Sequence, residues 1–372
     1  MPNIIFSTVG TSSLTKRNAE AERINDLSNL IENELSNGDR EFLNNQLLIK
    51  ENEIDNIFNN LQQLKEFSAE LNGILTFYNI NNLNNIDNQI LTMDYHILIA
   101  TDTYVGKLTS NLIKEILNRL GFNNVYIEPI DKLNTKNTEN FTEGVKNLRN
   151  VIYQNYILEA GYNNYKKILN LTGGFKSVNA FLNILGMFYA DEIIYVFETK
   201  TDLIKIPKLP IKIDYERLKE LYEEFLLINT ADGMEKSGID PIFLYIIDNR
   251  YILNEWGEFI WQEIKDSVIN EKKLPRFNNI QYDNIINRQF DVLQPIEKEL
   301  FALRIATLSK VGQISDILRR QPLNLNQDTD GHSEYKIELK DNIRIFLNYD
   351  ENQRKFRILS IRQHRSGRYE LI

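Results

Sequence analysis

The sequence predicts an α/β domain followed by a small α+β domain. In the first half of the chain, short apolar segments alternate with segments of helical spacing, which is typical of a parallel sheet with helices on both faces. Near the end, three segments of alternating apolar and polar residues are joined by tight polar turns, which is typical of an antiparallel meander. The length of 372 residues exceeds one ordinary core and fits two or three domains.

The composition indicates a globular, cytoplasmic protein without membrane contact. Hydrophobic residues make up 42% of the chain. No apolar run approaches the roughly 20 residues of a membrane helix, and the first residues lack the basic and apolar segments of a secretory signal. The sequence has no cysteine, which excludes disulfides, thiolate zinc sites and a cysteine nucleophile and fits a reducing compartment.

Charge is distributed unevenly along the chain. The formal net charge is −9, but residues 295–372 hold 14 Lys/Arg against 11 Asp/Glu, a net +3, which leaves −12 for the remainder. From Arg354 to Arg368 there are six cationic residues and no acidic one. We therefore expect only the C-terminal part to contact a polyanion directly.

The apolar segments and helical periodicities of the first half predict the order of its elements. The expected strands are residues 3–9, 95–100, 125–128, 167–171 and 193–197. The expected helices are two or three between residues 18 and 72, then 106–120, 143–159 and 177–189. In a sheet of this kind, ligands bind beyond the carboxyl ends of the strands.

Three loops of similar chemistry follow expected strands: STVGTSS, ATDT and LTGGFKS. Each offers small residues, hydroxyls and backbone N–H groups, and two precede helices, where the N–H groups and the helix dipole favour phosphate. Lys176 adds a mobile positive charge. Any one loop is equally well explained as an ordinary strand–helix turn, and LTGGFKS lacks the spacing of a Walker P-loop. Three such loops at one sheet edge favour a ligand site.

The loops STVGTSS, DTYVGKL and NLTGGFKSVNAF resemble those of the CARF domains of type III CRISPR effectors, and the resemblance covers residues 1–206. It implies a Rossmann-like, homodimeric domain that binds cyclic oligoadenylate, with cyclic tetra-adenylate as the expected ring. The ligand-site residues that it implies are Thr8, Gly10, Thr11, Ser12, Thr101, Asp102, Gly173, Gly174, Phe175 and Lys176.

The pattern of residues 207–277 predicts a helical connector between the two domains. The segment KIPKLP marks an exit from the sheet, and helices are expected at 215–227 and 248–270. Trp256 and Trp261 are interpreted as core or dimer contacts rather than as a platform for base stacking. A winged helix is an alternative, but no basic recognition helix supports it.

Residues 278–372 predict a small βααβββ domain. The expected strands are 289–293, 335–339, 343–349 and 356–361, and the expected helices are 295–306 and 310–320. Alternation places Lys336 and Glu338 on one strand face with Arg344 within reach, and His364 and Tyr369 follow the last strand. A basic cleft with a protonatable pair suits metal-independent RNA cleavage. A solvated basic terminus explains the composition equally well.

The segments YKIELKDNIRIFL and ILSIRQHRSGRYEL resemble the RelE/ParE toxin superfamily, whose RelE-type members are mRNA interferases. Lys336 and Arg344 match its central cationic positions, His364 stands where members carry Arg or His, and Tyr369 matches the terminal tyrosine. ParE-type relatives act on DNA gyrase, and the His/Tyr pair argues against that activity. Glu338 departs from members with a second lysine there. The catalytic residues implied are Lys336, Glu338, Lys340, Arg344, His364, Arg365 and Tyr369, with Lys340 and Arg365 as phosphate contacts.

Together the two resemblances imply a CARF–RelE fusion, a CRISPR-associated mRNA interferase. Such a protein is a homodimer, activated by cyclic oligoadenylate, that cleaves mRNA on the ribosome without a catalytic cofactor or metal. One alternative is a metal-dependent PD-(D/E)xK nuclease, because Asp330 with Glu334-Tyr-Lys336, or Glu338-Leu-Lys340, imitates its motif. Another is a ligand-gated protein that binds ribosomes or nucleic acid without cleaving.

Overall fold

The computed structural model describes most of the chain. The described residues are 1–157, 159–197, 202–210, 214–230, 233–235, 237–271, 273–311, 326–327 and 335–372. They form two compact units, Met1–Lys212 and Ile213–Ile372. In the described ranges, no helix has the length and apolar character to cross a membrane.

The first unit is built on a six-stranded sheet of order β3-β2-β1-β4-β5-β6. Its first five strands are parallel to their neighbours, and β6 runs antiparallel to β5. The strands are β1 (Asn3–Thr8), β2 (Tyr95–Thr101), β3 (Asn124–Ile130), β4 (Lys166–Asn170), β5 (Glu192–Val196) and β6 (Leu203–Pro207). The prediction of the five parallel strands is confirmed. β6 was not predicted, because Pro207 at its end and Pro210 beyond it resemble an exit from the sheet.

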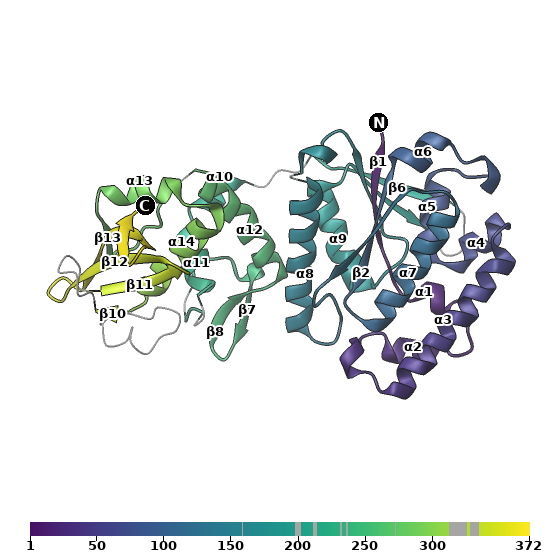
Figure 1. Ribbon diagram of the computed structural model, residues 1–372, viewed down its shortest axis with the longest axis horizontal. Coiled ribbons are helices and arrows are strands. Elements are labelled where there is room, and N and C mark those ends of the chain that lie inside the picture. Colours follow the sequence, from purple (N-terminus) through teal and green to yellow (C-terminus); the bar gives the residue numbers. More distant parts are fainter. Residues whose placement is uncertain are drawn as a thin grey trace. The chain divides into compact units, whose positions relative to one another are not determined.

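Helices cover both faces of this sheet (Figure 1), as alternating strands and helices require. α5 (Ala69–Phe77) contacts β4, β5 and β6, and α7 (Tyr104–Arg119) contacts β2 and β3. α8 (Thr138–Ile152) and α9 (Lys176–Tyr189) lie on the other side (Figure 1). The helix expected at 143–159 corresponds to α8, which ends at Ile152. A single π-helical turn, Tyr153–Ile157, follows it.

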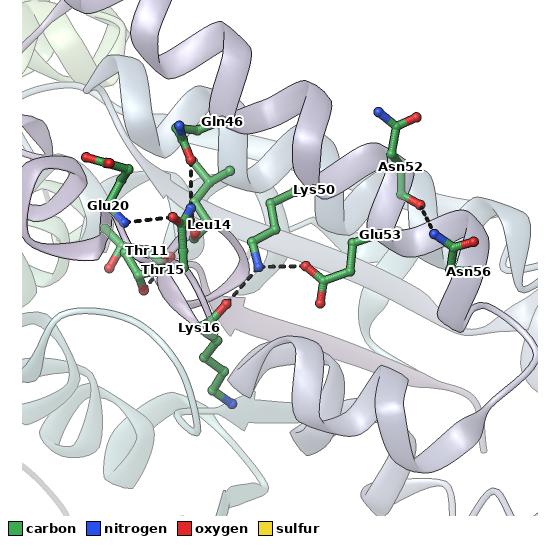
Figure 2. Close-up of polar contacts among 11 residues, drawn as sticks. Thr11, Leu14, Thr15, Lys16, Glu20, Gln46, Lys50, Asn52, Glu53 and Asn56 are labelled. Carbon is green, nitrogen blue, oxygen red and sulfur yellow. Dashed lines mark hydrogen bonds and ion pairs between the residues drawn. The ribbon is translucent and has the colours of Figure 1, made fainter.

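A helical insertion separates β1 from β2. Its helices are α1 (Ser12–Thr15), α2 (Ala21–Leu27), α3 (Asn37–Ile57), α4 (Leu61–Phe67), α5 and α6 (Asn88–Met93), with short 3-10 turns at Glu32–Glu34 and Leu83–Asn85. Lys50 of α3 is buried, and its Nζ donates to the Lys16 backbone oxygen and to Glu53 Oε2, both at 2.7 Å (Figure 2). A buried ammonium needs such partners, and here they fasten the end of α1 to α3.

The second unit begins with α10 (Tyr215–Lys219) and α11 (Tyr222–Ile228), then a 3-10 turn (Pro241–Phe243), β7 (Leu244–Ile247), β8 (Arg250–Leu253) and α12 (Glu255–Asn270). The predicted helix 248–270 is wrong at its start. Asp248 and Asn249 have φ angles of +48° and +62° and form the turn of the β7–β8 hairpin. Trp261 is buried against Tyr222 and Phe225, which confirms a core role, and Trp256 is partly buried.

The C-terminal part of this unit packs two helices against a second sheet. Its elements are β9 (Ile280–Tyr282), α13 (Ile285–Val292), α14 (Pro295–Ser309), β10 (Asn326–Gln327), β11 (Tyr335–Lys340), β12 (Ile343–Asp350), β13 (Lys355–Arg365) and β14 (Arg368–Leu371). The predicted strand 289–293 is wrong, because these residues belong to α13 and its end; the first strand is β9. The predicted helix 310–320 lies almost entirely outside the described residues.

β13 is longer than predicted and organises this sheet. It pairs antiparallel with β12 on one side, and on the other it pairs parallel with β9 and antiparallel with β14. In the gap between β9 and β14, the buried Gln289 amide accepts from the Ile361 N–H at 2.7 Å and donates to the Ile361 oxygen at 2.8 Å. A side chain from α13 thus replaces a missing strand at this point.

The pairing of β12 with β13 contains a bulge. Phe346 pairs with Ser360, but Leu347 pairs with Ile358, so Leu359 is an extra residue on β13. Ile358 and Ile361 therefore both face the core, whereas regular alternation would direct them to opposite faces.

The helical segment and the C-terminal sheet share one compact unit. Ala302 and Ala306 of α14 belong to the same buried cluster as Trp261 and Ile264 of α12, and Phe301 on the same helix packs in the core of the C-terminal sheet. α14 therefore connects the two cores, and the segment predicted as a connector packs closely against the domain that follows it.

Candidate functional site

The strand order of the first sheet creates a crossover between β1 and β4, where connections leave in opposite directions. Ligands bind at such points in α/β sheets. The loops after β1 and β4 touch there: a Cβ on Gly10 would lie 3.0 Å from the Gly174 backbone. Gly174 has a φ of +89°, and a Cβ there would meet the Thr8 side chain at 2.6 Å. Gly174 requires glycine and Gly10 leaves room for its backbone, so the sequence brings these two loops together as predicted.

A residue that was not predicted fills this crossing. Glu70 of α5 is fully buried, and its carboxylate accepts from Gly10 N at 2.8 Å, from Ser12 Oγ at 2.8 Å and from Ser68 Oγ at 2.9 Å. Gly173 lies flat against it, since a Cβ there would be 2.2 Å from Oε1. The donors expected to bind a phosphate therefore hold an internal carboxylate.

The backbone of α5 is fixed to the same place. Asn170, at the end of β4, donates from Nδ2 to the Glu70 backbone oxygen at 3.1 Å and to Ser7 Oγ at 3.2 Å. Gly73 leaves room for this amide, because a Cβ there would lie 2.2 Å from Asn170 Oδ1. Thr8 is buried and donates to the Gly173 oxygen at 2.7 Å. The inner residues of the predicted ligand site thus bind one another.

The loop after β2 shows the same pattern. Asp102 accepts from Lys132 N at 2.8 Å and from Asn134 Nδ2 at 3.3 Å. Thr101 is buried, and its hydroxyl shares a hydrogen bond of 2.8 Å with Thr103, the N-cap of α7. Beside this loop a hollow of about 340 Å³ reaches Lys107. The Asp102 and Thr101 side chains therefore stabilise the conformation of this loop through hydrogen bonds within the protein.

The outer residues of the predicted ligand site remain accessible. Thr11, Ser12 and Phe175 are partly exposed, and Lys176 is exposed at the first position of α9. Backbone N–H groups at a helix N-terminus and a lysine beside them attract anions. This outer tier is the part of the edge that can contact a ligand.

The C-terminal sheet has one face on the core and one open face. Ile337, Ile345, Ile358 and Ile361 point to the core beneath α13 and α14. The residues between them define the open face of β11–β14: Lys336, Glu338, Arg344, Phe346, Ser360, Arg362, His364 and Tyr369. Five of the seven predicted catalytic residues therefore share this open face.

Tyr369, on the edge strand β14, contacts side chains from the three other strands of this face. It pairs across the strands with His364, and their ring centroids are 5.0 Å apart. Phe346 packs edge-on against the tyrosine ring at 5.2 Å, and Lys336 Nζ lies 5.0 Å from the ring centre. Phe346 is fully buried beneath this cluster although it belongs to the open face. The predicted His/Tyr pair is thus held on an aromatic floor with a cation beside it.

Two arginines stand directly opposite each other on the same face, Arg344 on β12 and Arg362 on β13. Like charges in such a pair repel. Arg344 has Glu338 at 3.7 Å, whereas the Arg362 guanidinium lies 4.2 Å above the Phe346 ring and donates to Ser360 Oγ at 2.9 Å. Sequence reasoning missed Phe346 and Arg362. Their alternation with Arg344 and His364 was the available signal, but the predicted last strand ended at residue 361, one residue before Arg362.

Two predicted catalytic residues lie elsewhere. A register shift after Glu338 sets Lys340 at the end of β11 opposite Ile343, a core residue. Arg365 alternates with His364 and donates to Gln363 Oε1 at 2.9 Å on the other side of β13. His364 and Tyr369 themselves lie within β13 and β14, which corrects the prediction that they follow the last strand. Ser366 and Gly367, with φ angles of +48° and +83°, form the turn between the two strands.

The alternative motif for a metal nuclease can be placed only in part. Asp330 and Glu334 lie outside the described residues. Among the residues that the structure describes, no group of three or more His, Cys, Asp or Glu side chains is arranged to hold a metal ion. Glu338 faces Arg344.

The strand order and the glycine loops at the crossover place the first unit among Rossmann-like α/β domains. Residues 65–209 match the model of a family described as CRISPR-associated protein (Cas_APE2256). The match begins near the start of α5 and includes Glu70, β2 to β6 and the TGGFK loop. This match supports the interpretation that the protein is CRISPR-associated. No curated protein matches the chain.

Proposed function

We propose that this CRISPR-associated protein is an mRNA endoribonuclease of the RelE type, switched on by a cyclic oligoadenylate that binds the first unit. In this proposal a homodimer senses the ring, and the C-terminal domain cleaves mRNA on the ribosome in antiviral defence. The observation that carries the proposal is the open face of β11–β14, where His364, Tyr369 and Lys336 meet above a buried phenylalanine.

The proposed reaction is attack of the RNA 2′-oxygen on the adjacent phosphorus. The bond from phosphorus to the 5′-oxygen breaks, which yields a 2′,3′-cyclic phosphate and a 5′-hydroxyl. One group of the His364/Tyr369 pair accepts the 2′-hydroxyl proton, and the other protonates the leaving 5′-oxygen. Lys336 and Arg344 stabilise the charge that develops on the phosphate. The Tyr369 ring also offers a surface on which a base can stack.

The proposed ligand site is the outer tier of the first sheet edge, with Thr11, Phe175, Lys176 and the backbone of Ser12 as its contacts, because the Ser12 hydroxyl is bonded to Glu70. The exposed start of α9 supports binding of a phosphate there. Glu70 stays in the inner tier and braces the loops. The family match supports a role in CRISPR biology, and its range of residues 65–209 includes Phe175 and Lys176 but not Thr11 and Ser12.

The test is a purified translation system that contains ribosomes and a defined mRNA, with and without cyclic tetra-adenylate. Cleavage that requires both the ring and ribosomes, and that leaves 2′,3′-cyclic phosphate ends, is expected. Absence of cleavage in the presence of both the ring and ribosomes would contradict the proposal. Products with 5′-phosphate ends would favour the metal-dependent alternative, and ribosome binding without any cleavage would favour the non-cleaving one.

A further inference from the structure

The second unit contains a cavity of about 550 Å³ that lies apart from the open face of β11–β14. Its lining residues are Lys219, Tyr222, Glu223, Val268, Lys273, Leu274, Arg276, Tyr282 and Asn287. They come from α10, α11, α12, the segment before β9, β9 itself and α13. The volume lies within the range of small-molecule sites, which are concave and carry a few polar groups on an apolar wall.

The wall of the cavity is aromatic and apolar. Tyr222 and Tyr282 contribute rings, and Val268 and Leu274 contribute aliphatic surface. Tyr282 is held in place, because its hydroxyl donates to the Pro275 oxygen at 2.7 Å. Tyr222 is buried and stacks on Trp261 with a centroid distance of 5.7 Å. Tyr282, which is only partly buried, can therefore contact a flat ligand, whereas Tyr222 contributes little exposed surface.

The cations of the cavity differ in their partners. Lys219 pairs with Glu216 and Glu271, and Lys273 Nζ lies 2.9 Å from Glu271 Oε2. These two lysines are largely neutralised. The Arg276 guanidinium has no ion pair with any residue that the structure describes, although its backbone N–H donates to Glu223 Oε1 at 3.0 Å. A guanidinium left without a carboxylate beside a cavity fits an anionic group such as a phosphate.

The remaining polar groups suit a purine base. Glu223 has a second carboxylate oxygen, which can accept from a ring N–H or an exocyclic amine, and Asn287 offers both a donor and an acceptor. We infer that this cavity binds a purine nucleotide, with the base against Tyr282 and Glu223 and the phosphate on Arg276. The inference does not depend on the ribonuclease proposal.

Binding here would have a structural consequence within the second unit. The cavity is bounded by the helices α10 to α12 on one side and by β9 and α13 on the other. β9 pairs with β13, and α13 supplies Gln289 to β13. A bound nucleotide would therefore join the helical segment to the strand that carries His364.

The experiment is calorimetric titration of the full-length protein with AMP, GMP, ATP and GTP. At least one should bind, and Arg276→Ala should weaken that binding about tenfold or more, as expected for loss of a charge-assisted hydrogen bond. Arg288→Ala is the matched control, because Arg288 is exposed on α13 and does not line the cavity. Its affinity should equal that of the unmodified protein.

Glu223→Gln keeps an oxygen for the Arg276 N–H and should change the preference between adenine and guanine nucleotides several-fold. Melting temperatures of the unliganded variants check that each is folded. Absence of purine nucleotide binding at millimolar concentration would overturn the inference, as would unchanged affinity in folded Arg276→Ala. Binding of an oligoribonucleotide but of no mononucleotide would also overturn it.

Discussion

The crossover edge of the first sheet and the open face of the C-terminal sheet were both predicted as sites, but their polar groups are used differently. Along this edge of the first sheet, the Thr8 hydroxyl, the Gly10 N–H and the Asp102 carboxylate are bonded to other parts of the protein. On the open face, His364 is exposed and Tyr369 is partly exposed, and their partners are mainly aromatic rings. The polar groups of the sheet edge hold loops of the protein in place, whereas the polar groups of the open face remain accessible to another molecule.

This difference separates two roles that residue type alone does not distinguish. A small hydroxyl or glycine at a strand end can bind a ligand or can let two loops pack closely. Glu70 decides between these at the crossover, because it supplies an anion from within the chain. Substitutions in the two regions test whether they differ in function as they do in hydrogen bonding.

The largest effect is expected on the open face. His364→Ala should reduce ring-activated mRNA cleavage by about 10²- to 10⁴-fold, because a proton transfer partner is lost. Glu370→Ala is the control: its side chain follows Tyr369 but lies on the other side of β14. It should retain most of the cleavage rate, measured by primer extension. Equal loss in both variants would contradict the assignment of the open face as the active one.

At the crossover the largest effect should be on stability. Glu70→Ala leaves Gly10 N–H and two serine hydroxyls without their acceptor, which should cost about 3 kcal/mol or more, since each buried unsatisfied group costs about 1–3 kcal/mol. Denaturant unfolding measures this. Glu115→Ala, on an exposed position of α7, should change stability by less than about 0.5 kcal/mol. A stable Glu70→Ala protein would show that the carboxylate does not brace the loops.

His96 makes the stability of the first unit depend on pH. Burial lowers its pKa from 6.5 to about 3, so the unfolded chain binds a proton that the folded one does not. The free energy of unfolding should be constant above about pH 6.5. Between about pH 6.5 and pH 3 it should fall as the pH decreases, with a slope that approaches about 1.4 kcal/mol per pH unit. Thermal unfolding between pH 7 and pH 5 measures the slope. His96→Leu should flatten it, and an unchanged slope would exclude His96 as the cause.

The smallest effect is expected at the outer tier. Lys176→Ala should weaken cyclic tetra-adenylate binding about tenfold while it leaves the melting temperature of the unliganded protein unchanged, because the side chain is exposed. Lys146→Ala on α8 serves as the comparison and should bind the ring normally. Equal affinity in Lys176→Ala and the unmodified protein would place the ring elsewhere.

The sequence was sufficient for locating the five parallel strands along the chain and for the joining of the loops after β1 and β4, because glycine and apolar periodicity report directly on close packing. It was not sufficient for Glu70, which lies in a helix far from those loops in sequence. It also misplaced the start of α12, since the β7–β8 hairpin has short strands with exposed isoleucines such as Ile246. The open face was predicted in outline from Lys336, Glu338 and Arg344. Arg362 was missed because the predicted last strand ended at residue 361, and Phe346 was missed because a phenylalanine in a strand suggests the core rather than the open face.

Leu359 has a consequence for how this sheet can change during evolution. Because the bulge already absorbs one residue, a chain that lacks this position can pair β12 with β13 regularly and still direct Arg362 and His364 outward. A deletion between Ser360 and His364 would shift His364 to the opposite face of β13, unless the bulge at Leu359 were lost at the same time. Related sequences are therefore expected to tolerate a one-residue gap at Leu359, and an aligned family would show its length variation in β13 there rather than near the histidine.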